Sequence, residues 1–253
     1  MDLKLIPLAA ILGLCLGSFL NVCIHRIPKG ISIIYPSSSC PWCGSKIRAL
    51  DNIPLLSYLI LKGRCRNCGK HISIVYPIVE VLTSFVTVLV YIRFGLKFDA
   101  VLYLIFCYDL IVISFIDLRH KIIPDVLSVG GIGAGLLASL FLVRISFFDS
   151  ILGILFGGAF LYLIAFTYFK LKKIEGMGGG DIKLIAMIGA WLGYKSLPFV
   201  LLTGSLIGVI LGMIAILILK KGRYYEIPFG PFLSLGAYLY LFLDQRYIYL
   251  FIP

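Results

Sequence analysis

Long apolar runs separated by short polar segments dominate this chain. Runs of about 17–25 apolar residues are long enough to cross a bilayer as α-helices. Eight segments come close to this description, of which the sixth is the shortest: roughly 5–24, 77–94, 98–116, 126–145, 150–169, 182–197, 198–219 and 230–250. The pattern predicts an all-α polytopic membrane protein with about eight transmembrane helices.

Composition and charge agree with this prediction. Of the 253 residues, 60% are hydrophobic and 14% are charged, and the mean hydropathy is +1.04, which is outside the range of soluble domains. Because cytoplasmic loops carry most of the Lys and Arg, we place both termini outside, which leaves 17 of the 23 basic residues in cytoplasmic segments. The net charge of +11 therefore indicates a lipid bilayer with anionic head groups as partner. No aromatic-basic motif points to nucleic acid.

The first apolar run resembles a signal peptide in its position only. It is too long, lacks an A-x-A exit and is followed by its positive charges, so residues 1–26 are predicted to be a retained first span. Asn21 and His25 lie one helical turn apart and share a face at its cytoplasmic end. A polar helix end without chemistry explains this pair equally well.

The segment 27–76 is the one substantial polar loop, and it contains two C-x₂-C pairs separated by 21 residues: Cys40, Cys43, Cys65 and Cys68. Two such pairs are typical of one tetrahedral zinc ion. The alternative is a pair of disulfides, which are rare in the reducing compartment that the charge pattern assigns to this loop. Four sulfur ligands leave no open position, so the pattern predicts a structural zinc in a small cytoplasmic loop domain like a zinc knuckle.

Two acidic residues stand out in the second and third apolar runs. An ionisable residue within or near the bilayer needs a partner or a water-filled cavity. Glu80, at the start of the second run, is therefore a functional candidate, although a boundary carboxylate facing head groups is the competing interpretation. Asp109 lies deeper, and for it we favour a structural hydrogen bond.

A glycine-rich turn, Gly176-Met177-Gly178-Gly179-Gly180-Asp181, leads directly into the sixth apolar run. The predicted topology places its carboxylate at the cytoplasmic boundary, where Asp117 ends the third run. Irregular backbone at this depth is tolerated only within protein or beside a polar cavity. Glycines there leave room for a substrate strand and give access to positive φ. We therefore predict a polar cavity on the cytoplasmic face that contains both aspartates.

Two neighbouring carboxylates are suited to peptide hydrolysis. At about 4 Å and an effective dielectric constant of ~20, their repulsion is roughly 4 kcal/mol, so one stays protonated while the other is ionised. The ionised carboxylate can deprotonate water while the protonated one donates to the scissile carbonyl. A phosphate-binding loop is a weaker interpretation, because no strand or G-x-x-x-x-G-K-[ST] motif is present. A transporter with proton- or cation-coupled aspartates is the stronger alternative, but its acids would be expected near the bilayer midplane.

Glycines four residues apart recur in several apolar runs and permit close helix contact in lipid. The threefold repeat Gly204, Gly208 and Gly212 predicts a tight helix crossing in the seventh run.

At this level of detail the chain resembles the bacterial type IV prepilin leader peptidase/N-methyltransferase family, whose members are membrane aspartic proteases with a G-x-G-D motif. The resemblance covers about residues 13 to 233. The residues that carry it are Gly17-Ser18-Phe19-Leu20-Asn21-Val22 with His25-Arg26-Ile27-Pro28, the two cysteine pairs, Asn52-Ile53-Pro54-Leu55 with Ser57-Tyr58, Tyr76-Pro77 with Glu80, Ile116-Asp117 with Pro124-Asp125, the segment Glu175–Asp181 with Lys183-Leu184, and Pro228-Phe229-Gly230-Pro231.

This resemblance implies specific roles. Asp117 and Asp181 fall on the family's catalytic aspartates, and the supporting residues are Gly178, Gly180, Asp125, Glu80 and Lys183. It implies pilin-like substrates with a short basic leader, from type IV pilus or type II secretion systems, cut at the cytoplasmic face of the bacterial inner membrane. It also implies N-methylation of the new amino terminus by S-adenosylmethionine.

The resemblance also implies that Gly63 matches a position tied to methylation. Many relatives lack the cysteines, which implies that the metal is not essential for proteolysis. The predicted organisation is a first helix (1–26), a methylation-associated loop (27–76) and a seven-helix peptidase core (77–253).

Overall fold

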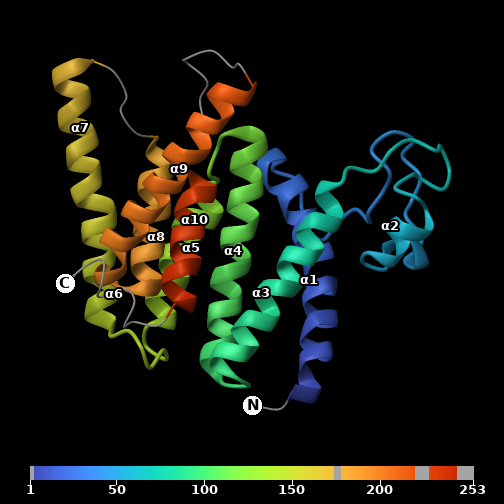
Figure 1. Ribbon diagram of the computed structural model, residues 1–253, viewed down its shortest axis with the longest axis horizontal. Helices are drawn as coiled ribbons and strands as arrows, with labels where there is room; N and C mark the ends of the chain where they lie inside the picture. The colour runs from blue at the N-terminus through green and yellow to red at the C-terminus, as the bar shows by residue number, and fades with distance from the viewer. Residues whose placement is uncertain (1–2, 174–177, 220–227, 244–253) are drawn as a thin grey trace. The chain divides into compact units, whose positions relative to one another are not determined.

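The computed structural model describes residues 3–173, 178–219 and 228–243 of the chain. These residues form helices and turns without any strand. The α-helices are α1 (Ile6–Arg26), α2 (Leu56–Ile60), α3 (Val75–Phe94), α4 (Phe98–His120), α5 (Asp125–Ala138), α6 (Phe147–Ile154), α7 (Leu161–Lys172), α8 (Gly179–Leu192), α9 (Leu197–Leu219) and α10 (Gly230–Phe242). A π-helical turn, η4 (Leu155–Phe160), joins α6 and α7 into one continuous rod (Figure 1). Short 3₁₀ turns are η1 (Leu3–Leu5), η2 (Ile27–Lys29), η3 (Ala49–Asn52) and η5 (Tyr194–Ser196).

Every predicted span corresponds to a helix, which confirms the all-α polytopic membrane fold. Among the described residues, five helical stretches are long and apolar enough to cross a membrane: Leu3–Lys29, Val75–Phe94, Phe98–His120, Phe147–Lys172 and Tyr194–Ile214. The other three predicted spans are the shorter helices α5, α8 and α10. The predicted end of the last span, 244–250, lies outside the described residues.

The chain divides into two compact units, Met1–Val112 and Ile113–Pro253. The division falls inside α4, so this helix contributes its first part to unit 1 and its last part to unit 2. Each unit is described by itself below.

In unit 1, α1 and α3 pack together at two glycines. A Cβ atom on Gly13 would lie 2.5 Å from the Cα atom of Ser84, and one on Gly17 would lie 2.7 Å from the Cα atom of Glu80. The hydroxyl of Ser84 also donates to the carbonyl oxygen of Ala10 at 2.8 Å. These two backbones approach so closely because the glycines have no side chains.

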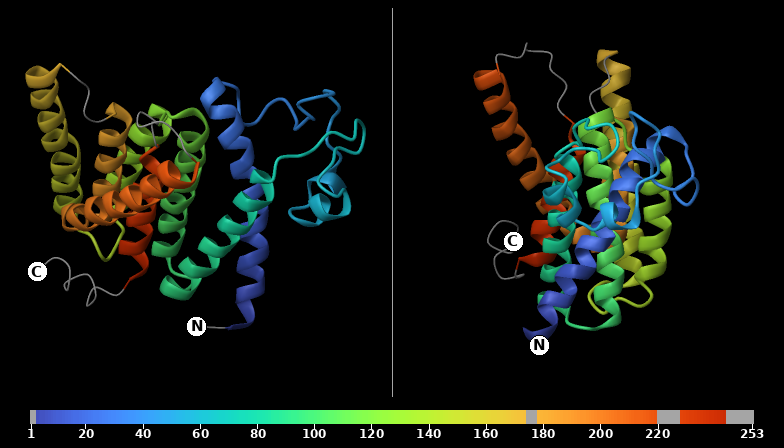
Figure 2. Two further views of the ribbon diagram at one scale, coloured as in Figure 1. Left: turned by 45° about the horizontal axis from the view of Figure 1, so that its top comes forward. Right: turned by 90° about the vertical axis from the view of Figure 1, so that its right-hand side faces the viewer.

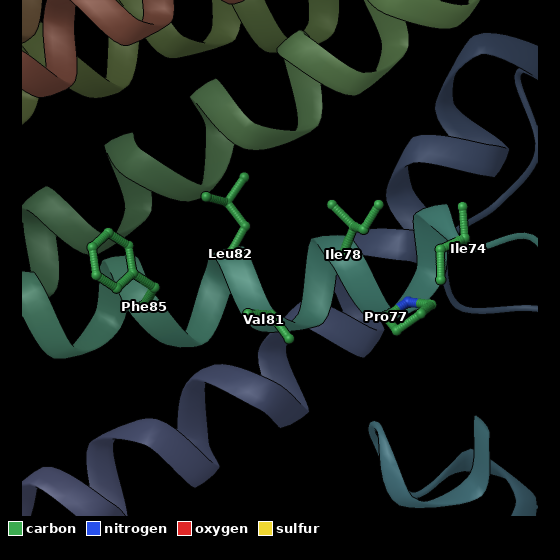
Figure 3. Close-up of a pocket in the computed structure, with 6 residues that line it drawn as sticks. All are labelled: Ile74, Pro77, Ile78, Val81, Leu82 and Phe85. Carbon is green, nitrogen blue, oxygen red and sulfur yellow. The ribbon is translucent and has the colours of Figure 1, made fainter. Parts of the chain in front are cut away.

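The side of α3 that faces away from α1 is apolar and exposed. Figure 3 shows the side chains that line a shallow groove along it: Ile74, Pro77, Ile78, Val81, Leu82 and Phe85. Glu80 and Thr83 lie on the other side of the helix and are buried. The polar and apolar positions of α3 therefore separate as expected for a helix with one side in lipid.

In unit 2, α8 forms the centre of the core and contacts α5, α6 and α10 (Figure 1). Its residues from Leu184 to Leu192 are all buried. Gly153 of α6 lies so close to Gly189 of α8 that a Cβ atom on either would overlap the carbonyl group of the other. The indole Nε1 of Trp191 donates to the carbonyl oxygen of Gly131 at 2.8 Å, which fixes α5 beside α8.

The predicted crossing at Gly204 and Gly208 exists and joins α9 to α10. A Cβ atom on Gly204 would lie 3.2 Å from the carbonyl oxygen of Phe232, and one on Gly208 would lie 3.1 Å from its ring. This crossing is looser than the contact between Gly153 and Gly189, so the tightest crossing of unit 2 lies elsewhere than the triple repeat suggested.

Candidate active site and metal site

Asp117 begins the last turn of α4 and is 5% exposed. Its Oδ2 atom accepts a hydrogen bond of 2.9 Å from the backbone N–H of Gly230, the first residue of α10. The N-terminal N–H groups of a helix have no partner within the helix, and they carry partial positive charge. The amino end of α10 is therefore the group that orients the Asp117 carboxylate.

Gly230 can occupy this position only because it has no side chain. A Cβ atom there would lie 2.7 Å from Oδ2 and 3.3 Å from Cγ of Asp117. The segment Pro228-Phe229-Gly230-Pro231 belongs to the family pattern, and the structure shows that it places an amide donor beside the Asp117 carboxylate. The signal in the sequence was a glycine between prolines just before an apolar run.

Asp181 lies in the first turn of α8 and is half-buried. A Cβ atom on Gly178 would lie 3.2 Å from Oδ2 of Asp181, and one on Gly180 would lie 3.1 Å from the Cβ of Ile123. Gly179 has open space around it. A side chain at Gly178 would crowd Asp181, and a side chain at Gly180 would crowd Ile123.

The prediction of positive φ is wrong for the described glycines of this turn. Gly178 has φ −65° and ψ 137°, and neither Gly179 nor Gly180 is among the glycines with positive φ, because both already belong to α8. Gly178 and Gly180 therefore matter here through the missing side chain and not through an unusual backbone conformation. Gly176 and Met177 lie outside the described residues.

Unit 2 brings the predicted residues of the peptidase site together. Asp117, near the end of α4, and Asp181, at the start of α8, both belong to unit 2. Nζ of Lys183 forms an ion pair of 2.6 Å with Oδ1 of Asp125, which links the first turn of α5 to the first turn of α8. The lysine and the third acid that the sequence singled out are therefore partners of each other.

The four loop cysteines also lie together. Their Sγ atoms are all within 4.8 Å of one another, and those of Cys40 and Cys68 are 3.9 Å apart. A tetrahedral zinc ion with Zn–S bonds of about 2.3 Å separates its ligands by about 3.8 Å. The donor set and its spacing therefore fit a metal ion of this kind.

The two cysteine pairs form the same turn twice, at an offset of 25 residues. The N–H of Gly44 donates to the carbonyl oxygen of Cys40, and that of Gly69 to Cys65, each at 2.9 Å. Both glycines have φ +68°. This repeat was missed in the sequence, although both pairs read C-x-x-C-G. The ion would thus be held by two equivalent knuckles.

Hydrogen bonds to sulfur favour a thiolate at one cysteine of each knuckle, Cys43 and Cys65. The side chain and backbone of Ser45 lower the pKa of the Cys43 thiol to about 6. The backbone N–H groups of Cys68 and Asn67 lower the pKa of Cys65. At Cys68 the backbone of Lys70 lowers the pKa, but desolvation and the neighbouring thiols outweigh it and raise the pKa to about 11. Nζ of Lys70 lies 4.3 Å above the Trp42 ring, so a cation–π contact joins one knuckle to the other.

Glu80 is 7% exposed and has a partner in the loop. Its Oε2 atom accepts a hydrogen bond of 2.9 Å from the backbone N–H of Leu55. Asn21 on α1 donates to the carbonyl oxygen of Tyr76 at 3.0 Å, at the start of α3. His25 lies 3.1 Å from Nζ of Lys29. Glu80 is therefore a buried acid with a protein partner, and not a boundary carboxylate facing head groups.

Gly63 has φ +65° and is buried. A Cβ atom there would lie 3.0 Å from both Cζ and Oη of Tyr58 in α2. Glycine at this position is thus required for two separate reasons, the backbone conformation and the contact with Tyr58.

Comparison with known sequences agrees with this geometry. Residues 11–94 match the bacterial Peptidase A24 N-terminal domain, and residues 104–213 match the type IV leader peptidase family. The chain is 38% identical to a prepilin leader peptidase/N-methyltransferase of Pseudomonas aeruginosa, over 91% of this chain and 88% of the relative. Proteins of the same name from Aeromonas hydrophila and Dichelobacter nodosus are 37% and 34% identical, over 92% and 90% of this chain and 89% and 87% of the relatives. No solved structure matches the chain.

The fold and the positions of Asp117 and Asp181 define a polytopic membrane protein with two candidate aspartates in one unit. The chain belongs to the type IV leader peptidase family.

Proposed function

We propose that the protein is a membrane aspartic endopeptidase that removes the basic leader from type IV pilin-like precursors and N-methylates the new amino terminus. The observation that supports the peptidase half is that unit 2 contains both Asp117 and Asp181, each beside a glycine that leaves room for its carboxylate. The relatives' names supply the substrate class and the second activity. They give no support to the transporter alternative.

In the proposed reaction the two carboxylates share one proton. The ionised one takes a proton from water, which attacks the carbonyl carbon of the scissile peptide, and the protonated one donates to the carbonyl oxygen. The Gly230 amide keeps the Asp117 side chain in place, and the exposed ion pair between Lys183 and Asp125 adds one contact between α5 and α8.

The four cysteines are proposed to hold one zinc ion with a structural role, because four thiolates complete a tetrahedral shell. S-adenosylmethionine supplies the methyl group when bound. We assign methylation to the region that contains the loop 27–76 and Gly63, between a first helix (1–26) and a peptidase core (77–253).

The distribution of Lys and Arg supports a location in the bacterial inner membrane with both termini outside and the site at the cytoplasmic face. Lys220, Lys221 and Arg223 contribute to this count and lie outside the described residues.

A single assay in detergent tests both activities. Purified protein is mixed with a pilin-type precursor and S-adenosylmethionine labelled on its methyl group. Mass spectrometry is expected to show a shortened product that carries one label, and elemental analysis about one zinc per chain. Because detergent holds no ion gradient, a transporter would show neither product. An intact precursor would refute the peptidase, and an unlabelled product would refute the methyltransferase.

A further inference from the structure

The cysteine loop has almost no core of its own. Of residues 27–74, only Cys40 and Gly63 are buried, and the first is a candidate metal ligand. Figure 2 shows the loop as a chain of turns around the short helix α2. Since side-chain packing fixes so little of it, contacts with the helices of unit 1 decide where its segments lie.

Two such contacts start from charged side chains of the helices. Arg26 of α1 donates to the carbonyl oxygens of Ser32 and Pro36 at 2.9 and 2.7 Å, which holds the beginning of the loop. Glu80 of α3 accepts from the N–H of Leu55 at 2.9 Å, which holds its middle. The second contact is buried at its carboxylate end, where a hydrogen bond to a charged group is strongest.

Glu80 binds the loop at a strained residue. Leu55 has φ 58° and ψ −50°, and the N–H of Leu56 donates to the carbonyl oxygen of Pro54 at 2.6 Å. Together these describe a γ-turn of the positive-φ form, which is rare and costly for a residue with a side chain. Such a conformation persists only where surrounding contacts enforce it, and the carboxylate of Glu80 is the contact at this amide.

The γ-turn leads directly to Gly63. Helix α2 begins at Leu56, and the carbonyl oxygen of its Tyr58 accepts from the N–H of Gly63 at 2.9 Å. The Tyr58 ring covers Gly63, and the carbonyl oxygen of Gly63 accepts from Ile72 at 2.8 Å. A continuous series of hydrogen bonds and backbone thus runs from Glu80 through Leu55 and α2 to Gly63.

We propose that Glu80 is a positioning residue for methyl transfer: by holding the γ-turn at Leu55, it places α2 and the Tyr58–Gly63 turn for the reaction. This inference rests on the proposed function, and it assigns Glu80 to the methylation half of the protein and not to peptide cleavage. Glu80 acts through the loop backbone and not on the substrate.

The test compares three variants in the detergent assay with labelled S-adenosylmethionine and a precleaved pilin-type peptide. Glu80→Ala is expected to lower kcat/KM for methylation about 10- to 100-fold, about 1.4–2.8 kcal/mol at 1.4 kcal/mol per tenfold, with the loss mainly in KM for S-adenosylmethionine. Glu80→Gln keeps an oxygen acceptor and is expected to stay within about 3-fold of the parent. Thr83→Ala is the matched control, since Thr83 is also buried on α3 but bonds within its own helix, to Val79.

A second variant tests the strain directly. Glycine adopts positive φ without the cost that leucine has, so Leu55→Gly is expected to restore methylation at least about 5-fold in the Glu80→Ala background. It is expected to change the parent less than 2-fold. If the effects of Leu55→Gly and Glu80→Ala on methylation simply multiplied in the double variant, the proposal would be overturned.

Limited trypsin digestion provides a readout that does not depend on methylation. Lys62 and Arg64 flank Gly63, and Glu80→Ala is expected to increase cutting there about tenfold relative to Thr83→Ala. Unchanged cutting, or equal loss of methylation in Thr83→Ala and Glu80→Ala, would overturn the role of Glu80. A parent protein that does not methylate, while Glu80→Ala still loosens this turn, would refute the proposed methyltransferase but leave the anchoring of the loop intact.

Discussion

The two candidate sites of this protein are held in place by different means. In unit 2, Asp181 begins a helix whose interior is buried without a gap from Leu184 to Leu192, and close glycine contacts lock that helix to its neighbours. In unit 1, the loop 27–74 has two buried residues and depends on four thiols, repeated turns and a carboxylate from α3. Packing therefore maintains the aspartates, whereas ligands and hydrogen bonds maintain the cysteine loop. The two sites should fail separately under different perturbations.

The largest effect is expected from the aspartates themselves. Asp117→Asn or Asp181→Asn removes a group that transfers a proton, so cleavage should fall at least about 10²–10⁴-fold. Methylation of a precleaved peptide should persist. Gel analysis of precursor processing measures the first, and label transfer measures the second. Asp99→Asn, at the start of the same helix as Asp117, is the control and should remain active; full cleavage by either catalytic variant would contradict the mechanism.

The next effect concerns packing in unit 2. Gly153→Leu introduces a side chain where even a Cβ atom overlaps the carbonyl of Gly189, and we expect a loss of at least about 3 kcal/mol in the free energy of unfolding. Thermal unfolding in detergent should show a clearly lower midpoint. Gly133→Leu on α5 is matched to it, because no atom lies within 4 Å of a Cβ there. Equal stability of the two variants would mean that this helix crossing contributes little.

Removing the metal should damage unit 1 alone. Cys65→Ser, or a strong chelator, is expected to abolish zinc binding, expose the loop to trypsin and reduce methylation at least about tenfold. Cleavage of the precursor should remain within about 3-fold, since Asp117 and Asp181 both belong to unit 2. Cys107→Ser serves as control, because Cys107 is buried in α4 and takes no part in the four-thiol cluster. Parallel loss of cleavage would show that the two sites are not separable.

The smallest effect is expected from Lys183 and Asp125. Their side chains are 43% and 66% exposed, and such a pair contributes roughly 0.2–1 kcal/mol. Lys183→Met or Asp125→Asn should therefore lower kcat/KM for cleavage by no more than about 5-fold. The exchange Asp125→Lys with Lys183→Asp should recover part of the loss. A double variant worse than the product of the single effects would argue against a simple ion pair.

The residues of both sites could be predicted from the sequence more completely than the contacts that hold them in place. Asp117, Asp181 and the four cysteines could be found because each combines a reactive side chain with a boundary or a regular spacing. The bond from Gly230 to Asp117 spans 113 residues, and that from Leu55 to Glu80 spans 25. Contacts of this kind depend on how helices pack and leave no periodic signal in one chain.

Two other differences have local causes. Apolar runs indicate burial but not helix length, so α5 and α8 proved shorter than their runs. Glycine in a turn suggested positive φ near Asp181, but Gly179 and Gly180 are already helical. Two of the glycines that do adopt positive φ, Gly44 and Gly69, follow the cysteine pairs, where a turn must reverse within two residues.

The hydrogen bond from Gly230 to Asp117 also imposes an order on biosynthesis. A nascent chain acquires both aspartates well before α10 emerges from the ribosome, but the amide that orients Asp117 is supplied by the first residue of that last described helix. A chain that stops after α9 contains both carboxylates and lacks this donor. If Asp117 acts as proposed, its carboxylate would gain its orienting donor only after α10 has been made and has packed against the end of α4.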